Sequence, residues 1–159
     1  MKSFVKRANR LLAKTGALVL AEPIPREGQR LSNLAETKTL NAQVKNLLAA
    51  AEEELFSDND DPMIKWTAQS LHEEISSIDD IALTMRVAAD SAIRRISPQD
   101  IEFWFREAGQ SDRLSLGDRI RTKCDAATTG EIKARLHGCL DFKEIAWRSS
   151  TAFFKITFK

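Results

Sequence analysis

Residues 62–96 read PMIKWTAQSLHEEISSIDDIALTMRVAADSAIRRI, and this stretch decides the predicted fold. Its apolar side chains recur at alternating steps of four and three residues, the period of a helix that packs along one seam. Asp61 and Pro62 supply an N-cap residue and a first-turn proline. The spacing therefore predicts one helix over residues 62–96, although the serines and aspartates of 76–80 can also cap a restart that would give two kinked helices. The seam consists of Ile64, Ala68, Leu71, Ile75, Ile78, Ala82, Met85, Ala89, Ala92 and Ile96.

A second helix is predicted before this stretch, over residues 31–56. The small polar residues of 57–61 follow it and favour a turn, because their side chains bond to nearby backbone groups. Two helices joined by so short a turn form an antiparallel helical hairpin. We therefore expect a mainly α fold, a long antiparallel helical hairpin plus a small three-helix module that ends in a β-hairpin.

The longer arm of this helical hairpin extends beyond the shorter arm, so part of its apolar seam needs another cover. A second copy of the chain would supply one through a coiled-coil contact. The alternative is a monomer whose own C-terminal part covers the seam. The residues predicted for self-association are Leu71, Ile75, Ile78, Ala82, Met85 and Ala89.

The C-terminal module covers residues 97–159. Ser97 and Pro98 begin its first helix, on which Phe103 is expected to be exposed. A second short helix follows a cap at residues 111–112. A capping box of Thr128 and Glu131 opens a third helix, over residues 129–138.

After the third helix the hydrophobic period changes to two. Ile145 and Trp147 alternate with polar residues, and so do the apolar residues of 154–158. This alternation predicts a β-hairpin with its turn at residues 148–151, although residues 141–147 also suit a short helix.

Three short helices followed by a β-hairpin resemble the winged helix-turn-helix family of DNA-binding domains, in element order and hydrophobic spacing. The glycine usual in the turn is missing, because residues 124–127 read CDAA. Such domains lay their third helix in the major groove of double-stranded DNA, while other side chains contact phosphates. The alternative is a structural cap on the helical hairpin. The nucleic-acid contacts that the resemblance implies are Arg119, Arg121, Lys123, Thr128, Thr129, Lys133, Arg135 and Arg148.

The N-terminal part is basic. Residues 1–21 carry five bases and no acid, and they predict a short amphipathic helix followed by an extended segment and a linker with Pro23 and Pro25. The chain is therefore divided into residues 1–30, 31–96 and 97–159. Membrane-surface attachment through residues 1–14 and a targeting role are the alternatives for this part.

Composition and motifs exclude several function classes. The 24 basic and 23 acidic residues nearly cancel, and no apolar run reaches the roughly 20 residues of a membrane span. Cys124 and Cys139 are the only cysteines, which is typical of reduced thiols in the cytoplasm. Neither a glycine-rich phosphate loop nor zinc-ligand spacing is present. We expect no enzymatic activity, no cofactor and no metal.

These observations predict a non-enzymatic DNA-binding protein that self-associates through its helical hairpin. It would act as a regulator or as an accessory factor in replication or partition. The alternative is a protein–protein interaction module, an adaptor or an inhibitor, that binds no nucleic acid.

Overall fold

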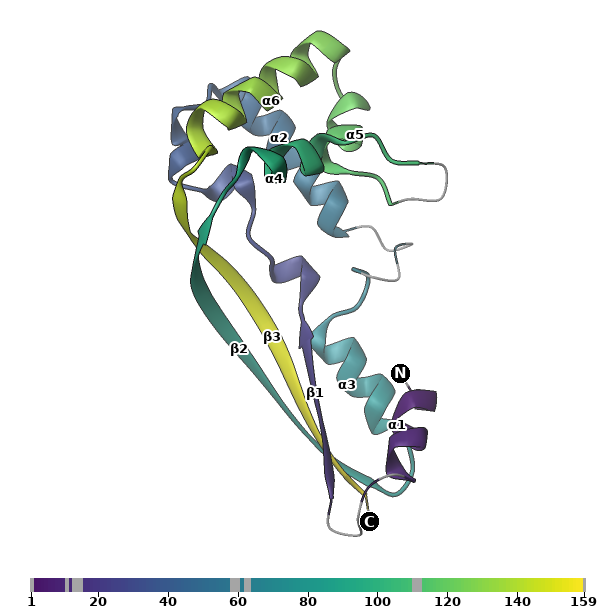
Figure 1. Cartoon of the computed structure of the whole chain (residues 1–159). Coiled ribbons are helices and arrows are strands. Elements are labelled where there is room, and N and C mark those ends of the chain that lie inside the picture. The colour runs from purple at the N-terminus through teal and green to yellow at the C-terminus, as the bar shows by residue number, and fades with distance from the viewer. Residues whose placement is uncertain are drawn as a thin grey trace. The chain divides into compact units, whose positions relative to one another are not determined.

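The computed structural model describes residues 2–10, 12, 16–57, 61, 64–109 and 113–158. Helices and strands are mixed along the chain (Figure 1). The helices are α1 (Lys2–Asn9), α2 (Ala42–Ser57), α3 (Ala68–Ser76), α4 (Pro98–Phe105), α5 (Leu116–Arg121) and α6 (Ala126–Leu140). The strands are β1 (Ala17–Pro23), β2 (Ile81–Arg95) and β3 (Glu144–Phe158). Short 3-10 turns are η1 (Pro25–Glu27), η2 (Leu31–Asn33) and η3 (Glu36–Thr39).

The three strands form one antiparallel sheet in the order β1-β3-β2. The register of the first pair places Ala17 opposite Thr157 and Pro23 opposite Thr151. β3 is thus the central strand, and β2, which precedes it in the chain by three helices, is an edge strand.

The predicted mainly α fold is wrong, because the sheet makes this a mixed α/β protein. The predicted helix over residues 62–96 is replaced by α3, which ends at Ser76, and by the 15-residue strand β2. Asp80, with φ of 59°, turns the chain between them. Ile81, Leu83 and Met85 are half-buried, while the residues between them are exposed, which is the period of a strand. The alanines of the predicted seam fit a helical spacing, but alanine is found both in cores and at surfaces. The helical spacing therefore hid the two-residue period of the strand.

The predicted β-hairpin with its turn at residues 148–151 is also wrong. β3 runs without a break from Glu144 to Phe158, through the residues predicted to turn at 148–151. Ser150 is extended there, and its carbonyl accepts a hydrogen bond from the Ile24 N–H at 2.8 Å. The pairing partners of β3 are distant in sequence, so the alternation in its own residues could not identify them.

Several local predictions are confirmed. Ser97 caps α4 with Pro98 in its first turn. The segment predicted to be extended over residues 17–21 lies in β1, which continues to Pro23 of the predicted linker. The helix predicted over 31–56 is confirmed from Ala42 onward, whereas residues 31–33 and 36–39 form the 3-10 turns η2 and η3. The third helix of the C-terminal module exists but begins earlier than predicted. Its N-cap is Asp125, whose side chain accepts a hydrogen bond from the Thr128 N–H, so the predicted capping box does not form. The caps predicted at residues 111–112 lie outside the described residues.

The chain forms two compact units, each built from segments distant in sequence. Unit 1 contains residues 1–28, 60–90 and 148–159, and unit 2 contains residues 29–59 and 91–147. The predicted divisions at 1–30, 31–96 and 97–159 were continuous in sequence, whereas these units are not.

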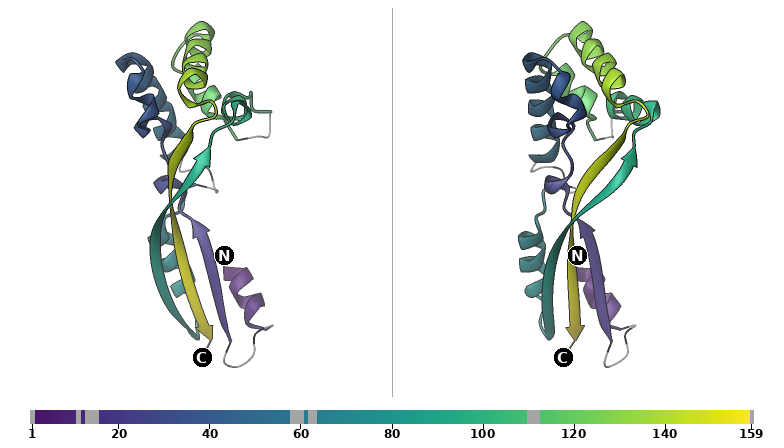
Figure 2. Two further views of the ribbon diagram at one scale, coloured as in Figure 1. Left: turned by 60° about the vertical axis from the view of Figure 1, so that its left-hand side comes forward. Right: turned by 90° about the vertical axis from the view of Figure 1, so that its left-hand side faces the viewer.

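Unit 1 has a core on one face of the sheet. Phe154 and Ile156 of β3 are fully buried there against Val5 of α1 and Ile75 of α3. Both views in Figure 2 show these two helices beside the strands. The opposite face is open, since Val19 is 61% exposed and Phe153 is 38% exposed.

Unit 2 has a helical core. Its buried side chains come mainly from α2, α4, α5 and α6, which gather together in Figure 1. Leu48, Ile101, Ile120, Ile132 and Leu136 are all fully buried in it. This core supports the candidate site.

Candidate functional site

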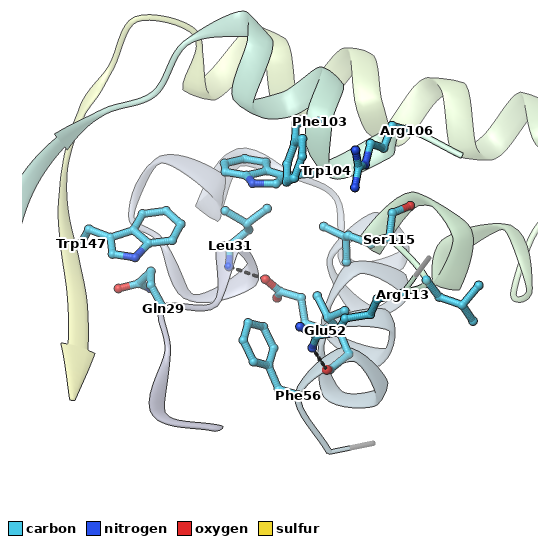
Figure 3. A pocket seen from close by; sticks show the side chains of 13 residues that line it. Gln29, Leu31, Glu52, Phe56, Phe103, Trp104, Arg106, Arg113, Ser115 and Trp147 are labelled. Carbon is cyan, nitrogen blue, oxygen red and sulfur yellow. Dashed lines mark hydrogen bonds between the residues drawn. The ribbon is translucent and has the colours of Figure 1, made fainter. Parts of the chain in front are cut away.

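A pocket of about 290 Å³ lies in unit 2, between η2 and α2 on one side and α4 on the other (Figure 3). Residues 113–116 and the beginning of β3 complete it. Most of the side chains that line it are apolar or aromatic. The lining residues are Gln29, Leu31, Glu52, Leu55, Phe56, Phe103, Trp104, Arg106, Arg113, Leu114, Ser115, Leu116 and Trp147.

Glu52 on α2 is the one carboxylate among these lining residues, and it is only 2% exposed. Its Oε1 accepts a hydrogen bond from the Leu31 N–H at 2.5 Å. Its Oε2 accepts bonds from the Ser32 N–H at 3.1 Å and the Ser32 hydroxyl at 2.6 Å. The first N–H groups of a helical turn have no partner inside the turn, so a carboxylate satisfies them. Glu52 therefore holds η2 against α2, and protein donors occupy both of its oxygens.

Burial raises the pKa of Glu52, and the hydrogen bonds from Ser32 and Leu31 only partly oppose that rise. A perturbed carboxyl group inside a pocket is a common sign of acid–base chemistry. Here the hydrogen bonds to η2 explain why the Glu52 carboxyl group is buried. They join η2 to α2 and do not point into the open part of the pocket. The geometry assigns Glu52 to the scaffold of the pocket.

Aromatic side chains form the wall opposite. Trp104 of α4 and Trp147 of β3 are stacked, with 6.3 Å between their ring centroids and 26° between their planes. The guanidinium of Arg94 lies 4.7 Å from the centroid of Trp147. It also forms a salt bridge of 2.7 Å with Asp100 at the start of α4. Stacking and the cation–π contact fix these rings in place.

Two exposed apolar residues and two arginines surround the mouth of the pocket. Phe103 is 58% exposed and Leu114 is 48% exposed. The guanidinium of Arg106 lies 4.5 Å from the centroid of Phe103. Arg113 donates a hydrogen bond from Nη2 to the Leu55 carbonyl at 3.2 Å. The mouth thus combines apolar surface with two guanidinium groups.

The segment that carries Ser115 is held by Asp118 of α5. The Asp118 carboxylate accepts hydrogen bonds from the N–H of Ser115 at 2.9 Å and of Ala108 at 3.1 Å, and it pairs with Arg121 at 2.5 Å. Burial acts to raise the pKa of Asp118, but the bonds from Ser115 and Ala108 and the charge of Arg121 bring it below its ordinary value. An ionised Asp118 therefore fixes both sides of this loop.

The residues predicted to contact DNA lie mostly on α5 and α6. Three of the basic side chains among them form ion pairs within unit 2. Lys133 pairs with Glu102 at 2.6 Å, Arg135 pairs with Glu131 at 2.6 Å, and Lys123 pairs with Glu54.

The other predicted DNA contacts have different environments. Arg121 pairs with Asp118, whereas Arg119 and Thr129 are buried. The Thr128 N–H caps onto Asp125 at 2.7 Å. Arg148 lies on β3, in unit 1.

The residues predicted for self-association do not form one seam. Leu71, Ile75 and Ile78 are buried in the core of unit 1. Ala82 and Ala89 are exposed on β2, and Met85 is half-buried on the same strand. They therefore lie on the helix α3, in the turn that follows it and on the strand β2.

Most of the pocket was not predicted from the sequence. Phe103 is exposed, as expected, whereas Glu52 is buried although it is the first of three consecutive glutamates, a run that is typical of a solvated helix surface. Trp147 was placed in a hairpin. A weak signal was available, because residues 103–106 contain three aromatic residues and one arginine, types that are enriched at many binding surfaces.

Within the described ranges, no group of three or more His, Cys, Asp or Glu side chains could hold a metal ion. In the same part of the chain, every helix is too short or too polar to cross a membrane. No protein-family model matches the chain, and no curated protein or solved structure shows significant similarity to it.

Proposed function

We propose that this chain is a non-enzymatic protein–protein interaction module, and that the pocket of unit 2 takes up an apolar side chain of a partner protein. The observation that carries the proposal is the combination, in one pocket, of stacked tryptophans, exposed Phe103 and Leu114, and two arginines. Aromatic residues and arginines are enriched at the energetic centres of protein interfaces.

The size of the pocket supports one inserted side chain. A dry cavity of roughly 150 Å³ accommodates a benzene-sized molecule, and this pocket measures about 290 Å³. It is near the lower limit of small-molecule sites, which begin at about 300 Å³. One phenylalanine, leucine or tryptophan side chain is therefore a suitable occupant.

The chemistry of the lining supports binding rather than catalysis. Glu52 is committed to Leu31 and Ser32, so it is not positioned to exchange a proton with a bound molecule. The remaining polar groups are an amide, a hydroxyl and two guanidiniums, which can orient a ligand.

The proposal is tested with a capped pentapeptide that has phenylalanine at its centre and serine elsewhere. Indole N–H signals in a nitrogen-15 NMR spectrum report on binding, after assignment with single Trp→Phe variants. We expect Trp104 and Trp147 to shift and Trp66, which lies in unit 1, to stay unchanged. A peptide with alanine at its centre should have no such effect.

Phe103→Ala should weaken this binding by roughly two- to tenfold, the contribution of one aromatic contact. Phe142→Ala is the matched control, because Phe142 is 61% exposed in the same unit but does not line the pocket. Unchanged signals for Trp104 and Trp147 at high peptide concentration, or equal effects of the two variants, would contradict the proposal.

The proposal also concerns the cellular location of the protein and its assembly. A cytoplasmic location is supported by the two free thiols, Cys124 and Cys139. Self-association through the predicted seam is not included, because Leu71, Ile75 and Ile78 are already buried within unit 1. Contact with double-stranded DNA stays a prediction of the sequence.

A further inference from the structure

β2 carries a free edge of the sheet in unit 1. Within the described part of the chain, the strand order β1-β3-β2 leaves one side of residues 81–89 without a neighbouring strand (Figure 1). Among the same described residues, no backbone hydrogen bond joins this stretch to a segment other than β3. A row of N–H and C=O groups at the edge of a sheet is a template for pairing with a further strand.

The sequence of this edge has few of the features that prevent such pairing. Natural proteins protect sheet edges with short strands, prolines or charged side chains. β1, the other edge strand, is seven residues long and ends in Pro23. Residues 81–89 read IALTMRVAA, with neither proline nor glycine and with one charge, at Arg86. The edge of β2 is therefore the one that suits another strand.

The backbone groups that face outward follow from the contacts on the β3 side. The Ala82 carbonyl accepts a hydrogen bond from the Thr157 hydroxyl of β3 at 3.4 Å. Ile96, an even number of residues further along, bonds toward the same side, because its N–H donates to the Lys143 carbonyl at 2.9 Å and its carbonyl accepts from the Phe142 N–H at 2.8 Å. The N–H and C=O of one strand residue point to the same side, and that side alternates along the strand. The residues whose N–H and C=O point away from β3 are therefore Ile81, Leu83, Met85, Val87 and Ala89.

We propose that this edge pairs antiparallel with β2 of a second copy of the chain, with the two Met85 residues opposite each other on a two-fold axis. In this register Leu83 lies opposite Val87, and Ile81 lies opposite Ala89. Each outward-facing residue then exchanges two backbone hydrogen bonds with the residue opposite. Only this two-fold register pairs all five of them. The contact closes after two copies and joins their sheets into one.

The side chains of the edge favour a second copy over an unrelated strand. Leu83 and Met85 are half-buried at the margin of the unit 1 core, and Val87 is 44% exposed. Pairing about Met85 places these apolar side chains against one another on the same side of the joined sheet. On its other side Arg86 lies opposite Thr84, so the one charge of the stretch does not lie directly opposite a like charge.

Sedimentation equilibrium of the natural chain from roughly 10 µM to 1 mM, the range of weak association, should show a reversible dimer. Val87→Pro should raise its dissociation constant roughly tenfold or more, because each copy loses a donor to the other. The Val87 N–H points away from β3, so proline there removes no hydrogen bond between β2 and β3.

Val19→Pro is the matched control. Val19 is 61% exposed on the other edge strand. The Ile24 N–H donates to the Ser150 carbonyl on the β3 side at 2.8 Å. Val19 is an odd number of residues away from Ile24, so its N–H points outward. This variant should leave the dimer unchanged.

A disulfide tests the register directly. Met85→Cys, made together with Cys124→Ala and Cys139→Ala, should form a disulfide between two copies under mild oxidation. Directly opposite residues have Cα atoms about 5.5 Å apart, within the range that a disulfide spans. Thr84→Cys in the same background should form it much more slowly, because its two copies are diagonal neighbours, about 7–8 Å apart.

A dimer that Val87→Pro weakens and Val19→Pro does not, with faster disulfide formation at Met85→Cys than at Thr84→Cys, is the expected result. A natural chain that stays monomeric over the whole range overturns the inference and would leave the edge to an extended segment of another protein. A dimer that the two prolines affect equally overturns it as well. Circular dichroism shows whether Val87→Pro folds, and if it does not, the comparison of the two cysteine variants decides: equal rates overturn the inference.

Discussion

Glu52 joins two backbone segments that the sequence separates by about twenty residues, because its carboxylate accepts every bond that the start of η2 offers. Its neighbours Glu53 and Glu54 are exposed on the same helix. Three consecutive residues of one type thus have different roles, which are set by the helical rotation and by what packs on each side.

Glu52→Gln should lower the free energy of unfolding by about 1–3 kcal/mol, the cost of a buried polar group left without a partner. A glutamine has one acceptor oxygen, and its amide nitrogen would face the N–H of Leu31 or Ser32. Denaturant unfolding measures the change. Glu53→Gln is the control and should stay within about 0.5 kcal/mol of the natural chain.

The cost of Glu52→Gln should also depend on pH. Burial raises the pKa of Glu52 above its ordinary value of 4.5, so the folded state holds the proton more tightly than the unfolded chain. The contribution of Glu52 to stability is then fully present at low pH and decreases as pH rises through the folded-state pKa. The difference between the natural chain and Glu52→Gln should therefore be largest below pH 4.5 and smaller at neutral pH. A difference that grows with pH would show that the ionised form is the better one in the fold.

At the scale of elements, α5 packs on the end of α4 through a position without a side chain. A Cβ on Gly117 would lie 2.7 Å from the Phe105 Cα and 3.0 Å from its carbonyl oxygen. These are backbone atoms that cannot rotate away, and α4 carries the aromatic wall of the pocket. The glycine thus permits the close approach of the two helices.

Gly117→Ala should destabilise the protein by about 1–3 kcal/mol through overpacking. Gly130→Ala is the matched control, because a Cβ there meets nothing within 4 Å on α6. It should stabilise the protein by about 0.5–1 kcal/mol, the usual gain when alanine replaces glycine inside a helix. Urea midpoints at unchanged slope measure both. Equal effects of the two substitutions would contradict the packing of α5 on α4.

At the scale of the whole molecule, charge is balanced. The formal net charge is +1, and four of the cations predicted to meet DNA, Arg121, Lys123, Lys133 and Arg135, are in ion pairs. Strong non-specific binding to DNA requires several cations that replace counterions along the phosphates. The balance of charge therefore favours a protein partner.

A fluorescence-anisotropy titration with random duplex DNA should accordingly give a dissociation constant above about 10⁻⁴ M at physiological salt, weaker than typical non-specific binding. Micromolar binding that falls steeply with salt and is weakened by Lys133→Glu with Arg135→Glu would restore the DNA contacts predicted from the winged-helix resemblance.

Local chemistry made part of the fold predictable. Ser97 and Pro98 act within one helical turn, so the start of α4 could be read directly. The same applies to the extended residues 17–21 and to the helical character of residues 42–56, although not to the start of α2. Phe103 could be expected at the surface because it lies off the apolar face of a short helix.

The remainder depended on partners that are distant in the chain. Residues 81–95 satisfy a helical spacing and a strand spacing at once, and pairing with β3 selects the strand. The pocket collects side chains from residues 29–31, 52–56, 103–106, 113–116 and 147. The sequence alone determined the start of α4, because the cap and the proline that set it act over a few residues. Only the tertiary structure decided the sheet and the pocket, because hydrogen bonds between strands and the burial of Glu52 depend on segments that meet only after folding.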